Sequence, residues 1–169
     1  MRLFMKGNVE KSLRDFDDGL ERFFSTSRKY RSTIRRGSIV LLDKKMKMFE
    51  FFTYLVRECG LEVGVVHVEE AASAKKAIGD IGAYDVKAVV IDSEMLGESL
   101  NGDSLPSWLA KNYPRIPIWV INCAEEKKNQ IRSQSRRVGI IEESATLETV
   151  AETVGFPEEC QKVIAHFAL

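Results

Sequence analysis

The chain has 169 residues, of which 44% are apolar and 30% are charged. That length suits one domain of ordinary size plus an extension, and the composition excludes a disordered tail, a collagen and a membrane protein. Lys plus Arg and Asp plus Glu each total 25, so the formal net charge is zero, which argues against a dedicated nucleic-acid-binding protein. The charge is uneven, however. Residues 1–37 hold ten basic and five acidic side chains, a net +5 that the remainder balances with −5.

The cysteines and histidines predict reduced thiols and no zinc site. Cys59, Cys123 and Cys160 are odd in number and widely spaced, which is typical of a cytoplasmic protein and not of a disulfide framework. His67 and His166 form no cluster with them at ligand spacing. The longest apolar runs are the length of a strand, too short to span a membrane.

Residues 9–35 are predicted to form one long helix. Basic residues gather in its last turns, where they suit the negative end of the helix dipole, and Gly37 ends it. This helix is compatible with packing on the chain's own domain, with self-association into a homodimer, or with a role as a connector to another module. Its apolar residues follow the spacing of a coiled-coil seam and are Leu13, Phe16, Leu20, Phe23, Tyr30 and Ile34.

After Gly37 the pattern changes to strands that alternate with helices. Apolar runs predict buried strands at 38–42, 61–68, 86–91, 116–121 and 138–141. Helical spacing predicts helices at 46–58, 69–82, 104–112, 125–136 and 146–154, and a further helix opened by Pro157.

Two details of this pattern carry expectations of their own. A polar loop is expected from Ser93 to Gly102, followed by Asp103 as the cap of the next helix. The helix at 46–58 holds more aromatic residues than one sheet-facing stripe can use. Its second face is therefore expected to be covered, either by the N-terminal helix or by a partner subunit.

The repeat of strand and helix predicts the fold class and the domain limits. Five such units imply an α/β fold with a doubly wound parallel sheet, most simply in the order 2-1-3-4-5. The expected divisions are an N-terminal helical arm over 1–37, the sheet domain over 38–155 and an additional C-terminal helix over 156–169. Ligands of such sheets bind beyond the carboxyl ends of the strands.

Two acids stand at the expected strand ends. Asp43 directly follows the strand at 38–42, and Asp92 directly follows the strand at 86–91. Two carboxylates in one crevice suit Mg²⁺, and one of them could instead accept a phosphoryl group. A third possibility is that both acids simply cap the loops that follow their strands.

Several segments resemble bacterial response-regulator receiver domains. Ser38-Ile39-Val40-Leu41-Leu42-Asp43 is similar to the first strand of that family, and Ala88-Val89-Val90-Ile91-Asp92-Ser93-Glu94-Met95 is similar to the third. Ile116-Pro117-Ile118-Trp119-Val120-Ile121 resembles the fourth strand, and Asn101-Gly102 resembles the Asp-Gly that follows the phosphorylation loop. The resemblance covers residues 38–155.

The resemblance implies roles for the residues at the strand ends. It gives Asp92 the phospho-acceptor position and Asp43 the first place of the acidic pair, whose second place is held by Lys44. The Thr or Ser position falls on Asn122, or on Cys123 if the register shifts by one residue.

Other positions depart further from the family pattern. The Lys position falls on Glu142, and the strand at 138–141 has no aromatic residue where the family's switch residue sits. These departures predict an acidic pocket of Asp43, Lys44 and Glu94 with at most a weak Mg²⁺ site at Asp43 and Asp92. The sequence therefore points to a degenerate, or pseudo-receiver, variant that is not an enzyme.

Three functions remain open. The first is a signalling module that works by protein–protein contact, with Arg132, Arg136 and Arg137, in and directly after the helix at 125–136, facing an acidic partner. The second is a working receiver that accepts phosphate from a histidine kinase on Asp92. The third is a flavodoxin-like small-molecule binder or metal-dependent enzyme, against which stands the lack of a Gly-rich phosphate loop.

Overall fold

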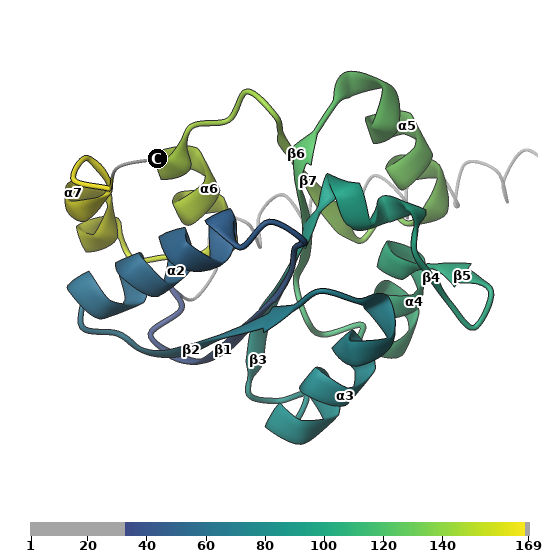
Figure 1. The fold of residues 1–169 in the computed structure, drawn as a ribbon, viewed down its shortest axis with the longest axis horizontal. Coiled ribbons are helices and arrows are strands. Elements are labelled where there is room, and N and C mark those ends of the chain that lie inside the picture. The colour runs from purple at the N-terminus through teal and green to yellow at the C-terminus, as the bar shows by residue number, and fades with distance from the viewer. Residues whose placement is uncertain (1–32, 168–169) are drawn as a thin grey trace, which may run out of the picture. The chain divides into compact units, whose positions relative to one another are not determined.

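The computed structural model describes residues 33–167. The chain divides into a unit of residues 1–32 and a unit of residues 33–169 (Figure 1). The predicted N-terminal helix therefore lies outside the described residues, apart from its last three positions. These three are not helical, because the first strand already begins at Arg36.

Ile34 is part of the sheet domain and not of a helix. The sequence pattern placed it on a helical seam, but it is 7% exposed and belongs to the core of the sheet domain. Its backbone N–H donates to the carbonyl oxygen of Gly155 at 2.8 Å. Next to it, Arg35 pairs with Glu159 at 3.0 Å. The start of the described chain is thus attached to the segment that follows the last long helix.

Five parallel strands form the central sheet. They are β1 (Arg36–Leu42), β2 (Glu62–Val68), β3 (Val86–Asp92), β6 (Ile118–Cys123) and β7 (Val138–Glu142). Their order is β2-β1-β3-β6-β7, and each neighbouring pair is parallel. This confirms the predicted 2-1-3-4-5 arrangement of an α/β sheet buried on both faces.

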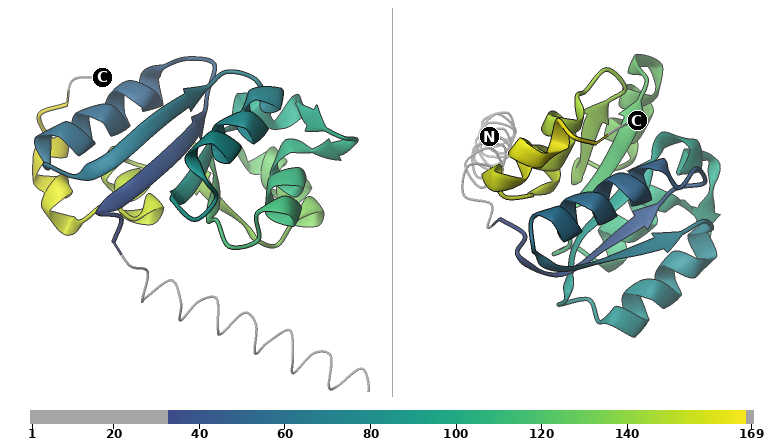
Figure 2. Two further views of the ribbon diagram at one scale, coloured as in Figure 1. Left: turned by 90° about the horizontal axis from the view of Figure 1, so that it is seen from below. Right: turned by 60° about the vertical axis from the view of Figure 1, so that its left-hand side comes forward.

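Helices cover both faces of the sheet (Figures 1 and 2). One layer contains α2 (Lys47–Glu58) and α6 (Leu147–Val154), and the other contains α3 (Ala71–Ile81), α4 (Leu105–Asn112) and α5 (Glu125–Gln134). Successive side chains of β1 point to opposite faces of the sheet. Ile39 and Leu41 pack in the core on the side of α2 and α6, whereas Val40 and Leu42 pack in the core on the side of α3, α4 and α5. None of the helices within residues 33–167 has the length and apolarity needed to cross a bilayer.

The segment after β3 is more ordered than the predicted polar loop. It forms the 3-10 turn η1 (Ser93–Gly97) and a two-stranded hairpin, β4 (Ser99–Leu100) with β5 (Asp103–Ser104). Asn101 and Gly102 both have positive φ, 53° and 85°, as a tight two-residue hairpin turn requires. Asp103 is consequently a strand residue. It does not cap α4, which Ser104 precedes.

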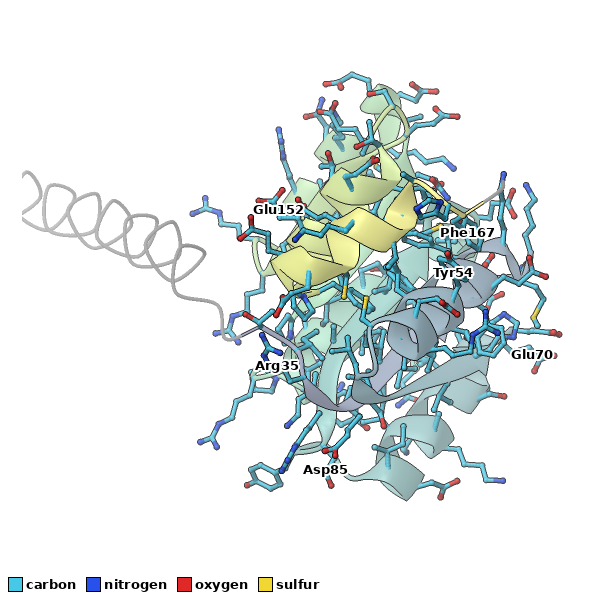
Figure 3. The ribbon with its side chains drawn as sticks, turned by 90° about the vertical axis from the view of Figure 1, so that its left-hand side faces the viewer. Arg35, Tyr54, Glu70, Asp85, Glu152 and Phe167 are labelled. Atoms are coloured by element: carbon cyan, nitrogen blue, oxygen red, sulfur yellow. The ribbon has the colours of Figure 1, made fainter. Side chains whose placement is uncertain are left out.

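The C-terminal segment covers the second face of α2. After α6 the chain forms η2 (Glu158–Cys160) and the short helix α7 (Gln161–Ile164), beyond which Phe167 packs on Phe51 and Tyr54 with ring centroids 5.4 and 5.2 Å apart (Figure 3). Tyr54 also donates its hydroxyl to the carbonyl oxygen of Val163 at 3.4 Å. The excess of aromatic residues in α2 therefore has an intramolecular cover, and it comes from the C-terminal end of the chain.

Candidate functional site

The candidate site lies where the parallel strands end. Asp43 follows β1, Asp92 is the last residue of β3, and Asn122 and Glu142 stand at the ends of β6 and β7. Because these strands run in the same direction in adjacent positions, their carboxyl ends share one edge of the sheet. The structure thus brings the residues expected from the sequence to one place, although their contacts differ from those expected.

Asp92 is 6% exposed and both of its carboxylate oxygens accept hydrogen bonds. Oδ1 accepts from the backbone N–H of Glu94 at 2.9 Å, which caps the turn η1. Oδ2 accepts from the side-chain amide of Asn122 at 2.7 Å. The carboxylate is therefore held by neutral donors from its own turn and from the neighbouring strand.

Asn122 reaches Asp92 through a local irregularity in β6. Its φ of 55° is left-handed, and the pairing of β6 with β7 shifts register between Val120 and Cys123. Asparagine tolerates this conformation better than most residues. The carbonyl oxygen of Asn122 in turn accepts from the hydroxyl of Ser93 at 2.8 Å, so two hydrogen bonds join the ends of β3 and β6.

Cys123 does not face Asp92. Its side chain is 1% exposed and packs in the core on the α3, α4 and α5 side of the sheet. Burial raises the pKa of the thiol, so it is protonated at neutral pH. Of the two residues left open by the sequence, Asn122 is the one in contact with Asp92.

Asp43 is more deeply buried than Asp92. At 1% exposure its Oδ1 accepts from the backbone N–H of Lys45 at 2.7 Å, whereas its buried Oδ2 has no hydrogen-bond partner among the described residues. The backbone carbonyl of Asp43 lies 2.6 Å from Nε2 of His67 on β2. Asp43 therefore serves first as a turn cap after β1.

The lysine that pairs with Glu94 of the expected acidic pocket is Lys45 and not Lys44. Lys45 pairs with Glu94, and the hydrogen bond to Glu94 and the Glu94 charge raise the pKa of the Lys45 ammonium, with smaller contributions from Asp92 and Asp43. Lys44 instead pairs with Glu98 at 3.0 Å. The conformation of the turn after β1 decides between these adjacent lysines, and no sequence pattern predicts it.

A third lysine lies beside the end of β7. Lys128 of α5 has a side chain only 9% exposed, and its ammonium contacts both Glu125 and, at 2.6 Å, Glu142. Hydrogen bonds to Glu125 and Glu142 raise the pKa of Lys128, and the same pairing lowers the pKa of Glu142. These groups line a hollow of about 370 Å³ next to Cys123 and Ser144. The sequence pattern did not predict Lys128, because the expected lysine position follows β7. Lys128 lies before β7 in the chain, on α5.

The carboxylates of Asp43 and Asp92 are engaged mainly by donors from the protein. Three of the four carboxylate oxygens of Asp43 and Asp92 accept hydrogen bonds from protein groups, and the fourth is shut away from solvent. Within residues 33–167, no three or more His, Cys, Asp and Glu side chains gather closely enough to hold a metal ion. Mg²⁺ is usually held by one or two carboxylates and several waters, so an ion bound here would have to replace these protein donors.

Comparisons with known proteins agree with the observed fold. No protein-family model matches the sequence, and no curated protein matches it. Among solved structures, a response regulator receiver domain protein from Clostridium thermocellum is 11% identical with a TM-score of 0.53, over 77% of this chain and 95% of that one.

Two further solved structures are similar to the same extent. The receiver domain of a signal transduction histidine kinase from Syntrophus aciditrophicus is 15% identical with a TM-score of 0.52, over 77% and 91% of the two chains. The phosphorylated cyanobacterial phytochrome response regulator RcpA is 15% identical with a TM-score of 0.52, over 79% and 97%. These likenesses establish that the chain has the fold of receiver domains.

Proposed function

We propose that this chain is a signal-transduction module of the receiver type that acts through protein–protein contacts, without phosphorylation of Asp92. The observation that carries the proposal is the state of the Asp92 carboxylate. Both of its oxygens are held by hydrogen bonds, one of them from the Asn122 side chain at the position of the family's Thr or Ser. A phosphoryl group on Asp92 would have to displace Asn122.

The charges around the site also favour this reading. A phosphoryl group needs cations around its oxygens. Each of the three lysines described above has its ammonium paired with a carboxylate: Lys44 with Glu98, Lys45 with Glu94, and Lys128 with Glu125 and Glu142. A phosphate would have to compete with fixed carboxylates for every one of these cations.

The same contacts hold the segment after β3 in one conformation. Lys45 binds Glu94 and Lys44 binds Glu98, so the two lysines after β1 pair with the two ends of η1. Glu98 also accepts the backbone N–H of Ala71 at 2.7 Å and so caps α3. Such a network supports a site that keeps one shape instead of changing it with a ligand.

The surface of α5 is the proposed contact face. This helix buries only Lys128 and Ile131, so the rest of it faces solvent. Arg132 and Arg137 are exposed there, on the helix and directly before β7. An acidic partner surface would complement them.

An amide NMR titration tests the first part of the proposal. Mg²⁺ alone and then Mg²⁺ with beryllofluoride, a phosphoryl mimic, are added to the labelled protein. We expect no saturable shifts at Asp43, Asp92 and Asn122. Shifts that begin there and spread to α5 and β7 would instead show the alternative function, a phospho-acceptor that works with a histidine kinase.

A gain-of-function variant provides the matched control. Lys44→Asp with Glu142→Lys restores an acid after β1 and a lysine after β7, and we expect it to respond to Mg²⁺ where the wild type does not. If this variant is equally silent, the missing charges are not the reason for the silence of the wild type.

The contact face is tested separately by capture of binding proteins. Arg132→Glu with Arg137→Glu should abolish binding of any partner held by the wild type, whereas Asp92→Asn should retain it. A partner that is lost with Asp92→Asn but kept with the arginine variant would refute the proposed surface.

A further inference from the structure

Two of the three cysteines lie side by side, although they are far apart in the sequence. Cys59 directly follows α2, and Cys160 is the last residue of η2. The Cys59 side chain lies within interaction range of the Cys160 thiol, and it packs against the core cluster that encloses Cys160. Both are free thiols in this structure. Sequence spacing gives no sign of this pair, since the topology alone brings its two elements together.

The surrounding contacts hold the two cysteines in place. Tyr54 of α2 donates to the carbonyl of Val163 in α7, and the ring of Phe167 packs on α2 (Figure 3). On the other side of Cys160, Glu159 pairs with Arg35 at 3.0 Å. These contacts join α2 to the segment that holds Cys160, and a disulfide requires two backbones that stay close together.

The two thiols differ in how a reagent can reach them. Cys59 is half-buried at the end of α2, whereas Cys160 is completely buried. Burial raises the pKa of the Cys160 thiol to about 12, so it is protonated at neutral pH. A dissolved oxidant therefore meets Cys59 first, and Cys160 can react only with a group already attached to Cys59.

We propose that Cys59 and Cys160 form a reversible disulfide in response to a small disulfide oxidant such as glutathione disulfide. The Cys59 thiolate attacks one sulfur of the oxidant, which breaks its S–S bond and releases one glutathione. The Cys160 sulfur then attacks the Cys59 sulfur of the mixed disulfide and releases the second glutathione. Two electrons pass to the oxidant, and the protons of the two protein thiols end on the two glutathione thiols.

The disulfide would connect α2 covalently to the segment that carries α7. It would also fix η2, where Glu159 holds Arg35 at the start of β1. The device does not involve Asp92 and goes beyond the proposed function. Cys123 cannot take part, because its side chain packs in the core on the opposite face of the sheet.

The test uses the full-length protein incubated with glutathione disulfide under native conditions. Mass spectrometry should find the wild type lighter by two hydrogen atoms, with a peptide link between Cys59 and Cys160. Closing a loop of about 100 residues should raise the melting temperature by on the order of 10 °C, and dithiothreitol should reverse the change.

Three variants separate the roles of the cysteines. Cys160→Ala should stop at one glutathione on Cys59, Cys59→Ser should not react at Cys160, and Cys123→Ala should form the disulfide as the wild type does. The proposal is overturned if the wild type also stops at the mixed disulfide, joins two chains through Cys59, or stays reduced. The mass measurement on the wild type decides the matter even if a variant fails to fold.

Discussion

A methyl group at Gly139 should destabilise the domain strongly. Gly139 lies in β7 opposite Trp119 of β6, and a Cβ atom placed on it would stand 2.1 Å from Cζ3 and 2.2 Å from Cε3 of the indole. Real Cβ atoms do not approach so closely, and Trp119 is only 5% exposed, so its ring has little room to move. The indole thus occupies the space that a side chain of β7 would otherwise fill.

The magnitude follows from measured effects of overpacking. Inserting a methylene into a packed core costs about 1–3 kcal/mol. With two ring carbons inside the forbidden distance, we expect Gly139→Ala to lower the free energy of unfolding by about 3 kcal/mol. Equilibrium unfolding in urea measures this as a shift of the midpoint.

Gly79→Ala is the matched control. Gly79 lies in α3, and a Cβ atom there would have no neighbour within 4 Å. The same substitution should therefore raise the free energy of unfolding by about 0.5–1 kcal/mol, because alanine favours a helix. Replacing Trp119 by Leu should also relieve much of the cost of Gly139→Ala, so the two changes should be less than additive. A loss below about 1 kcal/mol for Gly139→Ala would refute the steric explanation.

Two further predictions concern the hydrogen bonds of the site. Asn122→Gly removes the hydrogen bond to Asp92 but tolerates the left-handed backbone, whereas Asn122→Ala removes the same bond and adds backbone strain. Urea unfolding should therefore find the Ala variant less stable than the Gly variant by about 1 kcal/mol. Burial alone raises the pKa of Glu98, but the Ala71 N–H and the Lys44 ammonium outweigh it and lower the pKa below its ordinary 4.5. Glu98 therefore stabilises the fold above that pH and loses this effect as the pH falls through its lowered pKa. Urea midpoints across the acid range should fall less steeply for Glu98→Gln than for the wild type; parallel profiles would contradict this role.

Much of the fold follows from local pattern. Each predicted strand and each predicted helix after Gly37 has a counterpart in the structure, with ends that differ by a few residues. Continuous apolar runs predict β1 and β3, because successive side chains of a strand point to opposite faces and both faces of this sheet are covered. Helical spacing predicts α2, because it places Met48, Phe52 and Leu55 on one face of the helix. The expectations that did not hold concern local irregularities, such as the hairpin around Asn101 and the non-helical backbone at Ile34.

The candidate site was predictable in its location but not in its contacts. Asp43 and Asp92 stand at the ends of apolar strands, and parallel strands bring their ends to one edge of the sheet. This location does not depend on the contacts that the two side chains make. The contact of the Asn122 amide with Asp92 occurs at a bulge in β6. A bulge alters pairing with a neighbouring strand, so a single strand's sequence does not reveal it.

The sequence by itself determined the α/β class and the placing of acids directly after apolar strands, since these depend on residues that are neighbours in the chain. The strand order was expected only as the commonest arrangement with right-handed crossovers. Only the tertiary structure decided that Lys45 faces the acids, that Lys128 reaches Glu142, and that Cys59 meets Cys160. The physical reason is that such partners come from different elements. Whether they come into contact depends on how whole helices and turns pack together. Local periodicity in the sequence carries no information about that packing.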